Sequence, residues 1–290
     1  PVKTVDELSA VVSKIVGYEK ATDLKATWRS TALYLADNYL KPPVDNPKSE
    51  YPCTPLFCRD MAGDFAAYSD GVRALNPNKG NANLTPRVYF DPFPAFQTPS
   101  AVSDWWRVPV REDAQQRALA GMQSGPAIVV YNGHANVFNM GELEKIGGDR
   151  KFLLGLTDES RLFNANQLFV QLSITCMTSS FATPANSATT IDEAFFLWPR
   201  GGAVAVWGSS GQSVVTGHES LQDGFFGALF AKPGAAVRLG DLLDSGYLNL
   251  TMAASGNEDI LRTFLLLGDP LTKVAYPHGA NATYIPIVAK

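Results

Sequence analysis

The sequence has little of what would assign it to several common protein classes. Its 290 residues include three cysteines and three histidines, and its formal net charge is −4, with no run of Lys and Arg that could follow a phosphate backbone. We therefore expect no nucleic-acid partner. The longest apolar runs, such as AIVVY at 127–131, fall well below the roughly 18 residues that a membrane-spanning helix needs, so we expect no membrane span.

Motifs of metal and nucleotide chemistry are also missing from the sequence. It contains no HExxH motif and no CxxC pair, and GSSGQS at 208–213 lacks the Lys that ends a phosphate loop. Asp37, Asp64 and Asp91 lie near predicted strand ends or loops and could bind structural calcium, although their spacing does not require it. We predict no required cofactor and no catalytic metal.

What is present predicts a globular α/β protein, because a hydrophobic fraction of 46% and a charged fraction of 18% suit a chain with a sizeable core. Short apolar runs predict buried strands, and helical spacing of apolar residues separates them. This alternation predicts a mostly parallel sheet covered on both faces. The predicted strands are 31–38, 87–91, 127–131, 168–175 and 203–208, with a closing strand or turn near 269–270; the predicted helices are 4–19, 60–75, 111–124, 190–198, 218–230 and 238–254.

Two Pro-rich insertions interrupt this pattern, at about 39–58 and 92–110, and no internal repeat is visible. Cys53 and Cys58 lie in the first insertion, in the segment CTPLFC, where a disulfide could close a small loop; the alternative is two free thiols. If they pair, Cys176 is left over. An unpaired cysteine in an oxidised protein is a candidate for reactivity.

His134 and Cys176 each follow a predicted buried strand within three residues. If those strands are neighbours in a parallel sheet, both side chains lie at the same edge, where reactive groups collect. A thiol and an imidazole in that arrangement form a nucleophile and its acid. The alternatives are a structural histidine and an inert buried thiol. His218, where a helix begins, is predicted to be a surface or capping residue.

Four blocks of the sequence resemble a known family. AIVVYNGHAN and LFVQLSITCMTSSF, followed by AVAVWGSSGQSVVTGHE at 203–219 and TFLLLGDPLTKV at 263–274, resemble caspase-like peptidases, and among them the gingipain-type cysteine peptidases. The resemblance covers residues 1–275 and leaves 276–290 as a tail or linker. It implies a caspase-like three-layer sandwich. Two departures are Ala135, where the family usually has Gly, and Ile174-Thr175, where caspases have Gln-Ala.

The resemblance implies a secreted or cell-surface cysteine endopeptidase that cleaves protein or peptide substrates with His134 and Cys176. It further implies that the main-chain amides of Ala135 and Cys176 hold the oxyanion. The segment Trp207, Gly208 and Ser209 would wall the substrate pocket. Family members carry an upstream subdomain or propeptide, which we expect to be a partner of this chain. The alternative is an inactive caspase-like module that serves as a structural or binding part of a larger surface protein.

Overall fold

A computed structural model describes residues 2–21, 26–41, 53–92, 106–141, 145–146, 149–150, 152–182, 189–232, 234–253 and 258–277 of the chain. The helices are α1 (Val5–Lys20), α2 (Phe65–Leu75), α3 (Arg111–Gln123), α4 (Ile191–Leu197), α5 (His218–Phe230), α6 (Leu239–Ala253) and α7 (Glu258–Thr263), with short 3₁₀ turns at Thr27–Ser30 and Asp158–Arg161. The strands are β1 (Ala32–Ala36), β2 (Leu40–Lys41), β3 (Cys58–Arg59), β4 (Arg87–Phe90), β5 (Arg107–Val108), β6 (Ile128–Asn132), β7 (Asn139–Met140), β8 (Lys145–Ile146), β9 (Asp149–Arg150), β10 (Leu154–Gly155), β11 (Phe169–Ile174), β12 (Ala203–Ser209), β13 (Ala236–Arg238), β14 (Phe264–Leu267) and β15 (Lys273–Ala275).

Seven of these strands form one sheet in the order β14-β12-β11-β6-β1-β4-β5. All neighbours are parallel except β14, which runs antiparallel to β12 at the edge. From β1 the chain adds β4 and β5 on one side, then returns to the other side of β1 with β6, β11 and β12. The strand order therefore reverses between β1 and β6, the place where open α/β sheets usually bind ligands. The predicted mostly parallel sheet is confirmed.

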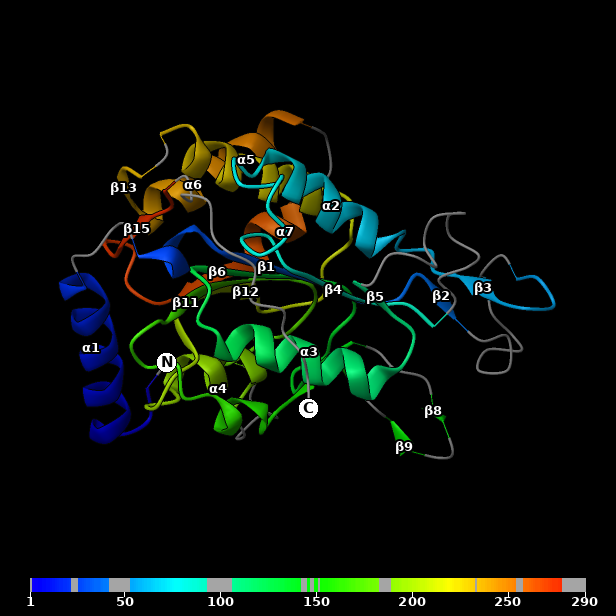
Figure 1. The fold of residues 1–290 in the computed structure, drawn as a ribbon, viewed down its shortest axis with the longest axis horizontal. Coiled ribbons are helices and arrows are strands. Elements are labelled where there is room, and N and C mark those ends of the chain that lie inside the picture. The colour runs from blue at the N-terminus through cyan, green and yellow to red at the C-terminus, as the bar shows by residue number, and fades with distance from the viewer. Residues whose placement is uncertain are drawn as a thin grey trace.

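Helices cover both faces of this sheet, which makes the three layers seen in Figure 1. Helices α2, α5 and α6 pack on one face, and α1, α3 and α4 pack on the other. Because both faces are covered, every residue of β1, β6, β11 and β12 is buried. This burial explains why the central strands read as continuous apolar runs in the sequence.

Local side-chain signals set where the helices begin. Thr4 with Glu7 and Thr190 with Glu193 form capping boxes at the starts of α1 and α4. Helix α2 begins at Phe65, later than the predicted start at residue 60. The physical reason is Gly63, whose φ of 98° lies outside the helical region. The helix starts only after Asp64, whose carboxylate accepts from the first free amides.

The two insertions are described only in part. The ends of the first form the β2–β3 hairpin, and the disulfide predicted between Cys53 and Cys58 is confirmed. In the second, the Arg87 guanidinium stacks 3.5 Å from the centre of the Trp106 ring, so Trp106 packs against the body of the protein. Residues 42–52, 93–105 and 278–290, which include Trp105 and His278, lie outside the described residues. Within the described ranges, no helix is both long and apolar enough to cross a membrane.

Candidate active site

The three strands at the centre of the sheet bring the candidate residues to one edge. In the ladder, Asn132 at the end of β6 pairs with Ala36 of β1 on one side and with Ile174 of β11 on the other. His134 and Cys176 each follow two residues later, on adjacent parallel strands. The prediction that they lie at the same end of the sheet is therefore confirmed. Their catalytic roles stay a prediction.

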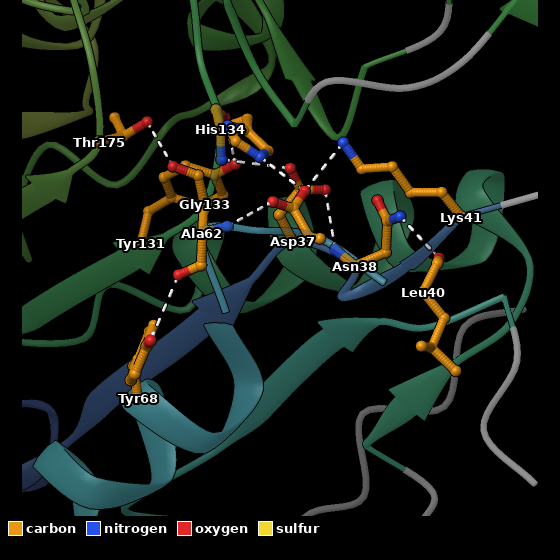
Figure 2. Close-up of polar contacts among 11 residues, drawn as sticks. Asp37, Asn38, Leu40, Lys41, Ala62, Tyr68, Tyr131, Gly133, His134 and Thr175 are labelled. Atoms are coloured by element: carbon orange, nitrogen blue, oxygen red, sulfur yellow. Dashed lines mark hydrogen bonds and ion pairs between the residues drawn. The ribbon is translucent and has the colours of Figure 1, made fainter. Parts of the chain in front are cut away.

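His134 is held by a carboxylate from another part of the chain. Its Nε2 lies 2.7 Å from Oδ2 of Asp60, and Nζ of Lys41 lies 2.9 Å from the same oxygen. Figure 2 labels His134 and Lys41. The backbone amide of His134 donates to Oδ2 of Asp37 at 3.2 Å, and the ring packs edge-on against Phe65. The imidazole is thus fixed on one side by a buried anion. About a quarter of its side chain, 26%, stays exposed.

Burial and charge act in opposite directions on this pair. Burial by itself would lower the pKa of His134, but the hydrogen bond and negative charge of Asp60 outweigh it, so the pKa of His134 is raised above 6.5. Burial would raise the pKa of Asp60, but the contacts with His134 and Lys41 outweigh it and lower this pKa to about 2. Asp60 therefore favours the protonated form of His134, and its ionised carboxylate accepts from Nε2 of the ring.

Cys176 is the free cysteine of the chain and is partly exposed. Its thiol donates to the carbonyl of Ser213 at 3.2 Å, and the Ser213 hydroxyl lies 3.7 Å away. Met177, the next residue, has a φ of 61°, which is unusual for a residue with a side chain, and its amide donates to Gly211. A left-handed residue of this kind costs about 1–3 kcal/mol and tends to occur at functional sites.

A buried carboxylate anchors the turn that follows Cys176. Asp192 at the start of α4 is fully buried and accepts hydrogen bonds from Gln171 and Ser173 of β11 and from Ser179 in the turn. Burial raises the pKa of Asp192, although these hydrogen bonds partly oppose the increase. The network ties the strand before Cys176 to the turn after it, so the cysteine is held from both sides.

Within the described part of the chain, no hydrogen bond joins the Cys176 thiol to His134. Because Asp60 occupies Nε2, the other ring nitrogen, Nδ1, is the one left to serve the thiol or a substrate. The oxyanion role of the main-chain amides of Ala135 and Cys176 stays a prediction; among the described residues, neither amide has a recorded acceptor. Neighbouring amides of the Ala135 turn do have acceptors, since Asn136 donates to Asn139.

The predicted substrate segment lies deeper than expected. The Trp207 ring is 0% exposed and stacks on Phe225, with Tyr247 in edge contact. The structure therefore contradicts the prediction that this side chain walls an accessible pocket; it fills the core beneath α5 and α6. Strand β12, which includes Gly208 and Ser209, is paired on both edges, so a substrate cannot add to it as a strand. Any other role of Gly208 and Ser209 in binding stays a prediction.

His218 also differs from its predicted position. It is 5% exposed, its Nε2 lies 3.1 Å from the Ser213 hydroxyl, and its ring packs edge-on against Phe264. The prediction of a surface or capping residue is wrong, because Gly217 precedes the helix and the Phe264 strand covers the ring. Burial lowers the pKa of His218 to about 4, so this second histidine is neutral near pH 7.

The acidic residues considered for calcium have other partners. Asp37 accepts from His134, Asp64 caps α2, and Asp91 pairs with Arg107 at 3.1 Å. Among the residues that the structure describes, no group of three or more His, Cys, Asp and Glu could hold a metal ion. Structural calcium stays an untested prediction.

Sequence reasoning missed Asp60, which contacts His134, and Ser213, which contacts Cys176. Asp60 lies 74 positions before His134 in the sequence, and Ser213 lies 37 positions after Cys176. The sequence held one signal for Asp60: it lies just after Cys58, which closes a small loop with Cys53 and so restrains the chain at that point. For Ser213, a Gly- and Ser-rich segment beyond a buried strand indicated a turn but not its contact.

Comparison with known proteins agrees with the fold of this chain. Solved structures with a similar fold include gingipain R, an Arg-specific cysteine proteinase (RgpB; TM-score 0.65, 16% identity, 94% of this chain and 54% of that one). A complex of the Porphyromonas gingivalis RgpB pro- and mature domains (TM-score 0.63, 15% identity, 94% and 55%) and a structure described only as a protease (TM-score 0.59, 14% identity, 100% and 58%) are also similar.

The chain spans little more than half the length of these relatives. At such low identity the structural likeness establishes the fold alone. A search of the curated proteins finds no significant match. The family model described as peptidase family C25, however, matches residues 1–275, nearly the whole sequence. The chain therefore belongs to peptidase family C25, the gingipain family of cysteine peptidases.

Proposed function

We propose that this chain is a cysteine endopeptidase in which Cys176 is the nucleophile, His134 the acid and base, and Asp60 the group that orients His134. The observation that carries the proposal is the ion pair between Asp60 and His134 beside a free cysteine on the adjacent strand end. A carboxylate on Nε2 fixes the ring and favours its protonated form. Membership in family C25 supports the same chemistry.

The proposed reaction begins when the Cys176 thiolate attacks the carbonyl carbon of the scissile bond. The carbonyl electrons move to the oxygen, which the main-chain amides of Ala135 and Cys176 would hold as an oxyanion. As the C–N bond breaks, His134 donates the proton on Nδ1 to the departing amine, leaving a thioester. Water then attacks the thioester carbon and gives one proton to His134. The C–S bond breaks, the thiolate of Cys176 and the protonated His134 are restored, and the carboxylic acid product leaves and loses its proton to solvent.

This chemistry needs only a thiol, an imidazole and main-chain amides, so the proposal includes no cofactor. The substrate is a protein or peptide, whose scissile carbonyl has to reach the edge of the sheet between β6 and β11. The disulfide between Cys53 and Cys58 supports an extracellular or cell-surface location, because such bonds persist in oxidising compartments. The incomplete coverage of the gingipain chains supports an additional subdomain or propeptide as a partner.

The test is hydrolysis of a mixed peptide library by the unmodified protein, by Cys176→Ala and by His134→Ala. We expect cleavage to disappear in the first variant and to fall strongly in the second, while a thiol-directed peptide probe labels Cys176 in the unmodified protein. Unchanged cleavage in Cys176→Ala would overturn the mechanism.

A second candidate function is an inactive caspase-like module. The observation that favours it is the Cys176 thiol, which donates to Ser213 rather than to His134 in the described structure. An imidazole that makes no contact with the thiol is not positioned to take its proton. Absence of cleavage by every form, together with inert Cys176 in the unmodified protein, would support this candidate.

A further inference from the structure

The last link between β6, which leads to His134, and β11, which leads to Cys176, is a side-chain hydrogen bond. The main-chain ladder of β6 and β11 ends at the pair Asn132 and Ile174. One residue further on, the hydroxyl of Thr175 donates to the carbonyl of Gly133 at 2.6 Å, and Figure 2 shows the two residues facing each other. Thr175 is 1% exposed, so water does not compete for this bond.

The main chain of Thr175 cannot make this link itself. Its amide donates back to Ser173 in its own strand, so the hydroxyl is what remains to reach across. The carbonyl of Thr175 is also held, because the Ser213 hydroxyl donates to it at 3.2 Å. The residue directly before Cys176 is thus fixed on both sides.

The other partner of the bond is equally constrained. A Cβ on Gly133 would lie 2.3 Å from the Tyr131 hydroxyl and 2.5 Å from Cβ of Asp37, so only glycine fits there. The Tyr131 hydroxyl donates to the carbonyl of His134 at 2.6 Å, and the His134 amide donates to Asp37. These contacts hold the main chain of His134 against the ends of β6 and β1. The hydrogen bond from Thr175 to Gly133 then ties this part of the chain to β11, the strand that leads to Cys176.

We propose that Thr175 is a positioning residue, whose hydroxyl sets the distance between Cys176 and His134 by tying their strand ends together. The proposal rests on the proposed peptidase function, but the contact itself does not. A displacement of about 1 Å between reacting groups can reduce a rate roughly 100-fold. Thr175 touches no substrate in this role and acts only through the two main chains.

The first test compares Thr175→Val, which keeps the shape and removes the donor, with Thr175→Ser, which keeps the hydroxyl. We expect kcat to fall roughly 10- to 100-fold in the Val variant with KM little changed, and to recover to within a few-fold in the Ser variant. The control is Thr272→Val, another fully buried threonine, whose hydroxyl has no partner among the described residues. If Thr175→Val does not fold, Thr175→Ala removes the same donor with less bulk.

The second test does not depend on peptidase activity. It measures alkylation of Cys176 by iodoacetamide in a double-mutant cycle of His134→Ala with Thr175→Val. In the Thr175 background, loss of His134 should slow alkylation; in the Val background, it should change the rate much less.

The outcomes separate the two proposals. Cleavage that needs Cys176 but is equal in Thr175→Val and the unmodified protein would overturn the positioning role and leave the function standing. No cleavage by any form, with an effect of His134→Ala on alkylation that disappears in the Val background, would support the positioning role and refute the peptidase. If His134→Ala has no effect on alkylation in either background, or an equal effect in both, the role of Thr175 is overturned.

Discussion

Replacement of Asp60 by Asn tests whether this carboxylate orients and charges His134. The change keeps the size of the side chain and removes its negative charge. Burial and Lys41 then remain to lower the pKa of His134, and only the charge of Asp37 remains to raise it. We therefore expect the pKa of His134 to fall below its value in the unmodified protein. Titration of the imidazole by NMR measures this directly.

The magnitude for stability follows from the lowered pKa of Asp60. Its shift from 3.8 to about 2 corresponds to about 2 kcal/mol of native-state stabilisation, undiminished by solvent because the side chain is 1% exposed. Since the folded pKa is the lower one, this contribution is present above pH 3.8 and is lost as the pH falls towards 2. Urea unfolding should show Asp60→Asn less stable by about 2 kcal/mol at pH 6, with the difference vanishing near pH 2.

His134 contributes with the opposite sign. Its folded pKa is raised, so its stabilisation is complete below pH 6.5 and is lost as the pH rises through the folded value. In Asp60→Asn, stability should no longer decrease above pH 6.5 through deprotonation of His134. The alkaline limb of kcat/KM, which we assign to deprotonation of His134, should move to lower pH in the variant. At pH 7, kcat/KM should fall by roughly 10-fold or more. The upper limit of this decrease is the roughly 10²- to 10⁴-fold that general acid catalysis supplies.

The matched control is Asp91→Asn, which breaks another buried ion pair, with Arg107. Asp91 is not among the charges that shift His134, so its replacement should lower stability without moving the His134 titration or the pH–rate profile. If Asp60→Asn leaves the titration and the profile of His134 superimposable on those of the unmodified protein, the assigned role of Asp60 is wrong.

Three further predictions concern the nucleophile, the disulfide and the first helix. Cys176→Ala should abolish cleavage and cost at most about 1–2 kcal/mol, because only one sulfur is removed; thermal melting beside the peptide assay checks both. Replacing Cys53 and Cys58 together by Ser should cost about 2 kcal/mol in urea unfolding, from loop closure over a sequence separation of 5, and should lower activity because their hairpin leads into the Asp60 turn; equal activity would contradict this coupling. Lys14→Met should destabilise the fold by about 2–3 kcal/mol, because its Nζ lies within hydrogen-bond distance of four main-chain carbonyl oxygens near the end of α4, whereas the exposed Lys20→Met should have little effect.

Much of the fold follows from short-range features of the sequence. The central strands are continuous apolar runs because both of their faces are covered, and the helices α1 and α4 begin at capping boxes that four consecutive residues define. The same local reasoning placed His134 and Cys176 at strand ends. A parallel sheet then brings those ends to one edge, so the common position of His134 and Cys176 could be predicted without any knowledge of side-chain packing.

Tertiary structure alone decided which residues contact His134 and Cys176. Asp60 reaches His134 because the turn that follows β3 meets the chain just beyond the end of β6, and Ser213 reaches Cys176 because the chain turns back after β12. Trp207 and His218 were misplaced for the same reason: whether a strand or helix residue is covered depends on which distant element packs there. Local sequence fixes backbone preference and the direction of side chains, whereas burial, hydrogen bonding and pKa depend on contacts between segments far apart in the chain.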